Sequence, residues 1–237
     1  MSPSLILLPA MLCDDDLYAP QTESLRDLVE ARPLVVAAAD MTEAVARVLQ
    51  QAPPRFVLAG TSYGGSLALE VTLAAPDRVL GLWLMGCNPG APRDPEGADR
   101  LRQRVQAGEF AAVVEELGAR SIFPAGPNAA TARRTFRTMA RRLGAETFLR
   151  QHATLFGRQD RRGALGRIEC PTLLTWGRED AFSDVGHASL LASRIPNADL
   201  IVLDTCGHLP TLEQPTATTR VARTWLARIE ARIEARR

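Results

Sequence analysis

The order of apolar and amphipathic segments predicts an α/β fold, a three-layer sandwich of about six mostly parallel strands with an inserted helical lid. Strand-like apolar runs alternate with helix-periodic runs through the first 90 residues and again after residue 167. This alternation is typical of parallel β-α-β units. Between these regions, residues 91–167 contain only helix-like patterns. We therefore expect a core of residues 1–90 and 168–237 and a lid of residues 91–167.

Uninterrupted apolar runs mark four strands in the N-terminal half, because strands buried on both faces of a parallel sheet have this pattern. They are residues 4–8, 34–37, 56–59 and 79–85. The helices that helical periodicity predicts there cover residues 20–29, 42–51 and 65–75. Thr42 is expected to cap the second of these helices, in which Glu43 and Arg47 have the spacing of an i,i+4 ion pair.

The alternation resumes after the lid. Two more strands are expected over residues 172–176 and 200–203, with helices over 185–194 and 215–236. We expect six parallel strands in the spatial order 2-1-3-4-5-6, numbered along the chain. In a parallel sheet every loop that follows a strand lies at the same edge, so chemistry-bearing residues after different strands can meet there.

The pentapeptide Gly60-Thr61-Ser62-Tyr63-Gly64 lies between a predicted strand and a predicted helix. A serine at such a sharp turn exposes its hydroxyl at the sheet edge, and glycines two positions before and after it let neighbouring backbone pass without a Cβ clash. The helix N-terminus also directs free N–H groups at negative charge that develops there. Ser62 is therefore a candidate nucleophile, against the alternative of a tight turn whose serine has no role.

A serine hydroxyl needs a neighbouring base to become a good nucleophile, and the chain has three histidines. His208 follows the strand that ends at Leu203, so it is expected at the same sheet edge as Ser62. His187 falls in the middle of a predicted helix, and His152 belongs to a helical face of the lid. His208 is thus the candidate general base.

The carboxylate that orients the base should follow another strand at this edge. Glu179 and Asp180 both follow the strand over 172–176. We favour Asp180, because the tight turn at Gly177 leaves it further from the strand end. It would hold the imidazole in the required tautomer and stabilise the imidazolium.

An oxyanion hole requires two backbone N–H donors. Tyr63 directly follows the candidate nucleophile and is expected to supply one of them. The other is expected from the loop after the first strand, where Met11 is the better candidate.

Four stretches carry a resemblance to a known family. They are residues 7–13 (LLPAMLC), 60–65 (GTSYGG), 177–180 (GRED) and 207–215 (GHLPTLEQP). On these motifs the chain resembles the α/β-hydrolase family over nearly its whole length. Within that family it is similar to small carboxylesterases related to pimeloyl-carrier-protein methyl ester esterase.

The resemblance implies an α/β-hydrolase fold with a catalytic triad. Its members carry the order serine, acid, histidine, which here corresponds to Ser62, Asp180 and His208, with the Met11 and Tyr63 amides as oxyanion donors. Relatives usually have His-Gly where this chain has Pro9-Ala10. The Ala10 methyl group leaves open a second class of function, a hydrolase-fold protein that binds a ligand without cleaving it.

Composition excludes several functional classes. The net charge of +1 predicts no general nucleic-acid or membrane-surface role, and no apolar run reaches the length of a membrane span. The four cysteines are far apart in sequence and have no metal-like spacing, so we expect reduced thiols, a cytoplasmic protein and no cofactor or metal. The aspartates at 14–16 are expected to cap a helix near Leu17.

The lid carries most of the positive charge. Residues 93–167 contain 15 arginines and 8 acidic residues, a net charge of +7. One interpretation is an amphipathic lid whose arginines face water. The other is a lid that covers an apolar acyl chain and attracts an anionic group, such as that of an acidic carrier protein.

We expect the substrate pocket to be lined by side chains from the loop after the first strand, the lid and the histidine loop. These residues are Ala10, Leu12, Phe123, Phe136, Phe148, His152 and Leu209.

The sequence therefore predicts a cofactor-independent serine hydrolase of small carboxylic esters, working through an acyl-enzyme. Thioesterase or enol-lactonase activity with the same triad, and the binding protein without activity, remain as alternatives. We expect a monomer or a homodimer.

Overall fold

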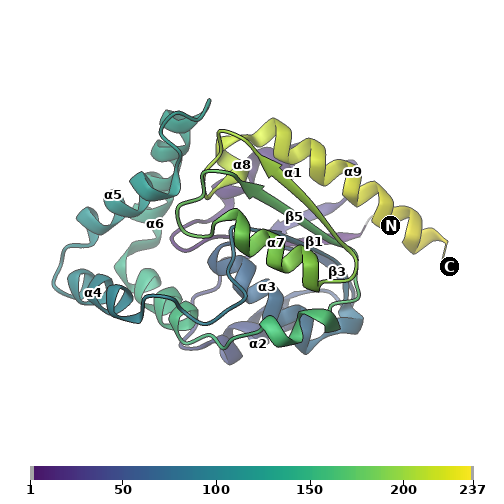
Figure 1. The fold of residues 1–237 in the computed structure, drawn as a ribbon, viewed down its shortest axis with the longest axis horizontal. Coiled ribbons are helices and arrows are strands. Elements are labelled where there is room, and N and C mark those ends of the chain that lie inside the picture. The colour runs from purple at the N-terminus through teal and green to yellow at the C-terminus, as the bar shows by residue number, and fades with distance from the viewer. Residues whose placement is uncertain (1–2, 236–237) are drawn as a thin grey trace.

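Six parallel strands form one sheet in the computed structural model, which describes residues 3–235 (Figure 1). The strands are β1 (Ser4–Leu8), β2 (Glu30–Pro33), β3 (Phe56–Thr61), β4 (Val79–Met85), β5 (Thr172–Gly177) and β6 (Ala198–Leu203). Their spatial order is β2-β1-β3-β4-β5-β6, and every neighbouring pair is parallel. The predicted strand order is confirmed, and the carboxyl ends of all six strands lie at one edge.

Helices cover both faces of the sheet (Figure 1). In the core they are η1 (Asp15–Leu17), α1 (Ala19–Ser24), α2 (Met41–Gln51), α3 (Tyr63–Ala74), η2 (Pro76–Arg78), α7 (Val185–Arg194), α8 (Pro210–Glu213) and α9 (Pro215–Glu234). Helices α2, α3 and α7 pack on one face, and α1 and α9 pack on the other. The sheet is thus the middle layer of a three-layer sandwich, as predicted.

The alternation of side chains along β1 divides the core between the two faces. Leu5 and Leu7 pack with Trp225 of α9, whereas Ile6 and Leu8 pack with Leu67 of α3. These four β1 side chains are at most 1% exposed. Burial of such a side chain contributes roughly 1.5–3 kcal/mol, so both faces stabilise the sheet that carries the site.

The second strand does not lie where it was predicted. β2 covers Glu30–Pro33, and the apolar run 34–37 follows it without helix or strand, its Leu34 N–H donating to the Leu7 carbonyl at 2.8 Å. β2 is an edge strand with alternating exposure, so its residues lack the uninterrupted apolar pattern used to find it. The run beyond it buries Val36 against the α3 side of the sheet.

Two helix predictions also need correction. The helix expected over 20–29 ends at Ser24, after which turns lead to β2. The cap of α2 is Asp40, whose side chain accepts the Glu43 N–H at 2.9 Å, and not Thr42. The predicted Glu43–Arg47 ion pair is present at 2.5 Å.

Residues 91–167, which we call the helical insertion, join β4 to β5. They contain α4 (Pro95–Gln106), α5 (Phe110–Ser121), α6 (Ala129–Phe156) and η3 (Arg162–Arg167), and no strand. Figure 1 shows α4, α5 and α6 beyond one end of the sheet. Helix α6 is interrupted at Gly144, whose φ of 79° and ψ of 175° are not helical.

Across residues 3–235, no helix combines the length and the apolar character that crossing a membrane requires.

Candidate active site

Ser62 occupies a strained turn between β3 and α3. Its φ is 56° and its ψ is −113°, a backbone conformation that residues other than glycine rarely adopt. The Ser62 N–H donates to the Met85 carbonyl of β4 at 2.8 Å, which ties the turn to the neighbouring strand. Strain of this kind costs about 1–3 kcal/mol and clusters at functional sites.

The flanking glycines are required by close backbone contacts. A Cβ on Gly60 would lie 2.2 Å from the Gly64 carbonyl oxygen, and a Cβ on Gly64 would lie 2.0 Å from the Leu8 carbonyl oxygen. Both contacts are with backbone, which cannot move aside as a flexible side chain can. The sequence argument for glycine at these two positions is thereby confirmed.

His208 and Asp180 form a buried pair. The His208 Nδ1 atom lies 2.9 and 2.8 Å from the two carboxylate oxygens of Asp180. Their side chains are 6% and 1% exposed. Asp180 Oδ1 also accepts the Phe182 and Ser183 N–H groups at 2.8 and 2.9 Å. A carboxylate fixed in this way directs the imidazole so that Nε2 is free for a reacting group.

The loops that carry this pair lie against each other at the carboxyl ends of β5 and β6. A Cβ on Gly177 would lie 2.0 Å from the Gly207 carbonyl oxygen, so only glycine permits the approach. Glu179, the acid not favoured from sequence, accepts the Cys206 N–H at 2.8 Å. Of the two neighbouring acids, Asp180 contacts the His208 side chain, and Glu179 binds the backbone of the loop that carries His208.

Glu213 fixes the backbone on both sides of His208. This carboxylate is 1% exposed. It accepts the N–H groups of Gly207 (2.8 Å), Leu209 (2.9 Å) and Phe123 (2.9 Å). Burial raises the pKa of Glu213, and the three backbone N–H groups oppose that rise. Glu213 therefore joins the histidine loop to the segment between α5 and α6.

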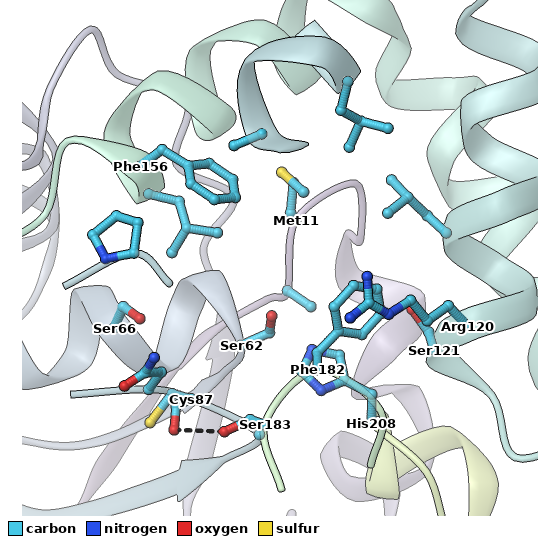
Figure 2. Close-up of a pocket in the computed structure, with 18 of the residues that line it drawn as sticks. Met11, Ser62, Ser66, Cys87, Arg120, Ser121, Phe156, Phe182, Ser183 and His208 are labelled. Carbon is cyan, nitrogen blue, oxygen red and sulfur yellow. Dashed lines mark hydrogen bonds between the residues drawn. The ribbon is translucent and has the colours of Figure 1, made fainter. Parts of the chain in front are cut away.

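Ser62 and His208 line the same cavity (Figure 2). A Cβ on Gly86 would lie 2.9 Å from His208 Nδ1, and Gly86 follows the Met85 carbonyl that binds the Ser62 N–H. Among the described residues no hydrogen bond joins the Ser62 hydroxyl to the imidazole. Such contacts are often long in enzymes without substrate.

Two backbone N–H groups are candidates for an oxyanion hole. Tyr63 is the first residue of α3, so its N–H has no intrahelical acceptor. Met11 lines the cavity, and its N–H has no acceptor within residues 3–235. Burial raises the pKa of the Tyr63 phenol, which donates to the Val36 carbonyl at 3.2 Å and anchors the start of the helix.

The cavity has a volume of about 430 Å³. Of the predicted pocket residues, Ala10, Phe136 and Leu209 line it. Apolar side chains from the helical insertion form much of the rest of the wall. These are Ala98, Leu101, Leu117, Leu155 and Phe156.

Four predicted pocket residues do not line the cavity, and their placement corrects the prediction. Leu12 and Phe148 are fully buried in the core. His152 stacks behind the cavity residue Phe156, with ring centroids 4.4 Å apart. Phe123 lies at the segment held by Glu213. Helical periodicity finds an apolar face, but it does not separate residues that face a cavity from those packed behind it.

Sequence reasoning also missed polar residues of the cavity wall. Ser66, Cys87 and Ser183 line it, and the Ser183 hydroxyl donates to the Cys87 carbonyl at 3.0 Å (Figure 2). Ser66 lies one helical turn after Ser62, so the periodicity of α3 could have identified it. Phe182, whose ring centroid is 4.9 Å from that of His208, carries no comparable signal.

Many arginines of the helical insertion already have acidic partners. Arg137 binds Glu115 at 2.6 Å, and Arg142 binds Asp14 at 2.7 Å. Two arginines of the cavity wall have no acidic partner within the described chain, and these are Arg120 and Arg158.

The two guanidinium groups are held by backbone carbonyls. Arg120 lies 4.2 Å over the Phe182 ring and donates to the Ala181 carbonyl. Arg158 donates to the carbonyls of Gly90 and Leu155, and burial lowers its pKa. Neither guanidinium is therefore paired with a carboxylate, although Asp94 and Glu116 also line the cavity.

Residues 3–235 contain no group of three or more histidine, cysteine, aspartate or glutamate side chains that could hold a metal ion.

Comparison with known proteins supports a single family. Residues 8–221 match the family model described as the alpha/beta hydrolase family. The chain is 30% identical over 177 residues to a 2-hydroxy-6-oxononadienedioate/2-hydroxy-6-oxononatrienedioate hydrolase of Cupriavidus pinatubonensis, covering 70% of this chain and 60% of the relative. The chain thus spans about three fifths of the length of that relative.

Another relative and a solved structure agree with this placement. The chain is 28% identical over 184 residues to the pimeloyl-[acyl-carrier protein] methyl ester esterase of Nitrosospira multiformis, covering 74% of this chain and 69% of the relative. A thermophilic esterase of Thermogutta terrifontis superposes with a TM-score of 0.83 at 25% identity, covering 97% of this chain and 91% of the esterase.

Proposed function

The chain belongs to the alpha/beta hydrolase family, and we propose that it is a cofactor-independent hydrolase of carboxylic esters that works through an acyl-enzyme on Ser62. One observation carries the proposal. The buried pair of His208 and Asp180, with a separation of 2.8 Å, borders the same cavity as the strained turn of Ser62. A nucleophile, a base and a group that orients the base are the parts that acyl transfer requires.

In the acylation step, His208 Nε2 takes the Ser62 Oγ proton while Oγ attacks the ester carbonyl carbon. The carbonyl electrons move to oxygen, and the N–H groups of Met11 and Tyr63 stabilise the oxyanion. When the carbonyl re-forms, the bond to the alcohol oxygen breaks and the imidazolium gives that oxygen its proton. Asp180 stabilises the imidazolium and keeps the ring oriented.

In the deacylation step, His208 takes a proton from water as the water oxygen attacks the acyl-enzyme. A second oxyanion forms and collapses, Ser62 Oγ leaves with the proton from the imidazolium, and the carboxylic acid is released. The net reaction adds one water to one ester and yields an acid and an alcohol. A thioester or a lactone would react through the same steps.

The cavity supports a substrate that has both an apolar part and a negative charge. Leu101, Leu117 and Phe156 present an apolar wall, whereas Arg120 and Arg158 bring positive charge without acidic partners. Two similar proteins also support an anionic substrate. One is named for the hydrolysis of dienedioates, and the structure of the thermophilic esterase contains malate. We propose that an anionic group of the ester binds inside the cavity, in preference to a carrier protein on the outer arginines.

An ester panel tests the proposed activity. We expect hydrolysis of short p-nitrophenyl esters by the wild-type protein, and a loss of at least about 10³-fold in Ser62→Ala. Ser193→Ala, an exposed serine of α7, is the matched control and should keep full activity. Stoichiometric reaction with a fluorophosphonate but no turnover of any ester, thioester or lactone would favour the binding protein instead.

The anionic group is tested with two substrates of equal length, the p-nitrophenyl monoester of glutarate and p-nitrophenyl pentanoate. Arg158→Gln and Arg120→Gln should each raise KM for the glutarate monoester by about tenfold, which corresponds to the loss of one charge-assisted hydrogen bond. KM for the neutral ester should stay within about twofold. Equal effects on both substrates would refute the anionic subsite and leave the hydrolase assignment intact.

A further inference from the structure

Helix α6 of the helical insertion holds the loop that follows β1. Three of its residues contact the short segment 12–14. The Leu12 N–H donates to Gln151 Oε1 at 2.9 Å, the Asp14 N–H contacts the Met139 sulfur at 3.5 Å, and Arg142 binds the Asp14 carboxylate through Nε and Nη2 at 2.7 and 2.8 Å. The loop that contains Met11 is therefore fixed from outside the sheet.

The interruption of α6 allows both of its halves to reach this loop. Met139 and Arg142 precede Gly144, and Gln151 follows it. At Gly144 the φ of 79° suits glycine, and no atom lies within 4 Å of the position a Cβ would take. The glycine therefore serves the backbone geometry of the bend, and no close packing contact requires it.

The turn that contains Met11 has an unfavourable backbone conformation. The Cys13 N–H donates to the Ala10 carbonyl at 3.0 Å, which closes a β-turn with Met11 and Leu12 at its centre. Leu12 has a φ of 60°, whereas glycine or asparagine is usual at this third position of a type II turn. A leucine in this conformation persists only where its surroundings hold it.

Gln151 is the group that holds this turn. It is 1% exposed, and its carbonyl oxygen accepts the Leu12 N–H while its amide donates to the Val36 carbonyl at 3.1 Å. The same Val36 carbonyl accepts the Tyr63 hydroxyl at 3.2 Å. One side chain thus touches the residue after Met11 and the carbonyl that anchors Tyr63, and these two residues carry the candidate oxyanion donors.

We propose that Gln151 is a positioning residue for the oxyanion site, and that it keeps the 10–13 turn in the form that leaves the Met11 N–H available to the substrate. Arg142 supports the same turn through Asp14. This inference rests on the proposed hydrolase function, because an oxyanion forms only if an ester is attacked. It also gives the helical insertion an indirect part in transition-state binding, through the turn that contains Met11, in addition to its part in the cavity wall.

The test uses Gln151→Met, which keeps an unbranched side chain but removes the strong acceptor and both amide donors. We expect kcat on a neutral p-nitrophenyl ester to fall about 10- to 100-fold, below the 10²–10³-fold loss that accompanies removal of one whole oxyanion donor. KM should change by less than about threefold, since the oxyanion contact forms only in the transition state. Rates are expressed per site reactive with a fluorophosphonate, so that unfolded protein does not count.

A second readout separates positioning from general loss of structure. The Ser62 oxygen adds to the carbonyl carbon of an alkyl trifluoromethyl ketone, and the hemiketal oxygen that results lies in the oxyanion site. The matching methyl ketone only occupies the cavity. In Gln151→Met, affinity for the trifluoromethyl ketone should fall by about the same factor as kcat, and affinity for the methyl ketone should not change. A purely structural role would weaken both ketones equally.

Two further variants complete the design. Arg150 directly precedes Gln151 on the same helix and forms an exposed ion pair with Glu146. Arg150→Gln removes this ion pair and should behave as wild type. Arg142→Gln should lower kcat by a smaller factor, about threefold. Its ion pair with Asp14 is partly exposed, and the interaction energy of such a pair corresponds to no more than about this change in rate.

The outcomes distinguish the inference from the proposed function. An unchanged kcat in Gln151→Met, or an equal loss of affinity for both ketones, would refute the positioning role and leave the hydrolase assignment standing. Absence of hydrolysis by the wild-type protein would refute the proposed function, and the inference with it.

Discussion

Replacing Ser62 by glycine should stabilise the protein while abolishing its activity. The φ of 56° and ψ of −113° at Ser62 cost about 1–3 kcal/mol for a residue with a Cβ. Glycine adopts this conformation freely, but its more flexible unfolded chain offsets about 0.4–1 kcal/mol of the gain. The Ser62→Ala variant keeps the strain, so Ser62→Gly should be more stable than Ser62→Ala by about 0.5–2 kcal/mol.

Thermal and urea unfolding of the two variants measure this difference. For a chain of this size, 1 kcal/mol corresponds to about 2–4 °C in Tm, so Ser62→Gly should melt about 1–8 °C above Ser62→Ala. At an unstrained site the order is reversed, because alanine normally exceeds glycine in stability. A higher Tm for Ser62→Ala would therefore refute the idea that the turn stores strain. Neither variant should hydrolyse esters faster than the low residual rate that remains when the nucleophile is removed.

Three other changes have defined outcomes. Gly64→Ala should destabilise the fold by about 3 kcal/mol in urea unfolding, because the new Cβ meets the Leu8 carbonyl oxygen at 2.0 Å; a stability within 1 kcal/mol of wild type would contradict the close approach. Asp180→Asn should lower kcat by about 10⁴-fold with little change in KM, since His208 loses its orienting carboxylate; a loss below tenfold in steady-state kinetics would exclude that role. Because the pKa of Glu213 is raised by burial, its contribution to stability is full below the unfolded-state pKa and is lost as pH rises through the native pKa. The stability difference between wild type and Glu213→Gln, measured by urea unfolding, should accordingly shrink from about pH 4.5 upward, and a difference that widens with pH would show the opposite shift.

The parts of the fold that sequence predicted are those with a strong local pattern. Five of the strands have uninterrupted apolar runs or follow directly from alternation with helices, and their order follows from parallel connections. The edge strand β2 was misplaced because half of its residues face solvent, so the apolar run beside it gave the stronger signal. β6 is also partly exposed, but its apolar run 200–203 made it recognisable, so the run of apolar residues and not burial itself gave the signal.

The same reasoning explains the site. Ser62, Asp180 and His208 each follow a strand, so topology alone directs them to one edge. Hydrogen bonds from side chains to the backbone of a loop have no comparable pattern in the sequence. The clearest case is Glu213, the last residue of the short helix α8, which accepts three backbone N–H groups around the histidine loop.

The helical insertion was predictable as helix but not in its contacts. Gln151 and His152 are neighbours in α6, yet Gln151 binds the loop after β1 and His152 stacks behind the cavity wall. The non-helical backbone at Gly144 lies between the two halves of α6. Phe148 and His152 both follow that glycine, and periodicity within this half of α6 does not separate residues that face the cavity, such as Phe156, from those packed behind it.

The central claim is that His208 makes the hydroxyl of Ser62 nucleophilic. Mass spectrometry after treatment with a fluorophosphonate measures this most directly. We predict one adduct per chain, on the peptide that contains Ser62, absent in Ser62→Ala and formed at least about 100-fold more slowly in His208→Ala. An adduct on another residue, or a labelling rate that does not depend on His208, would contradict the account.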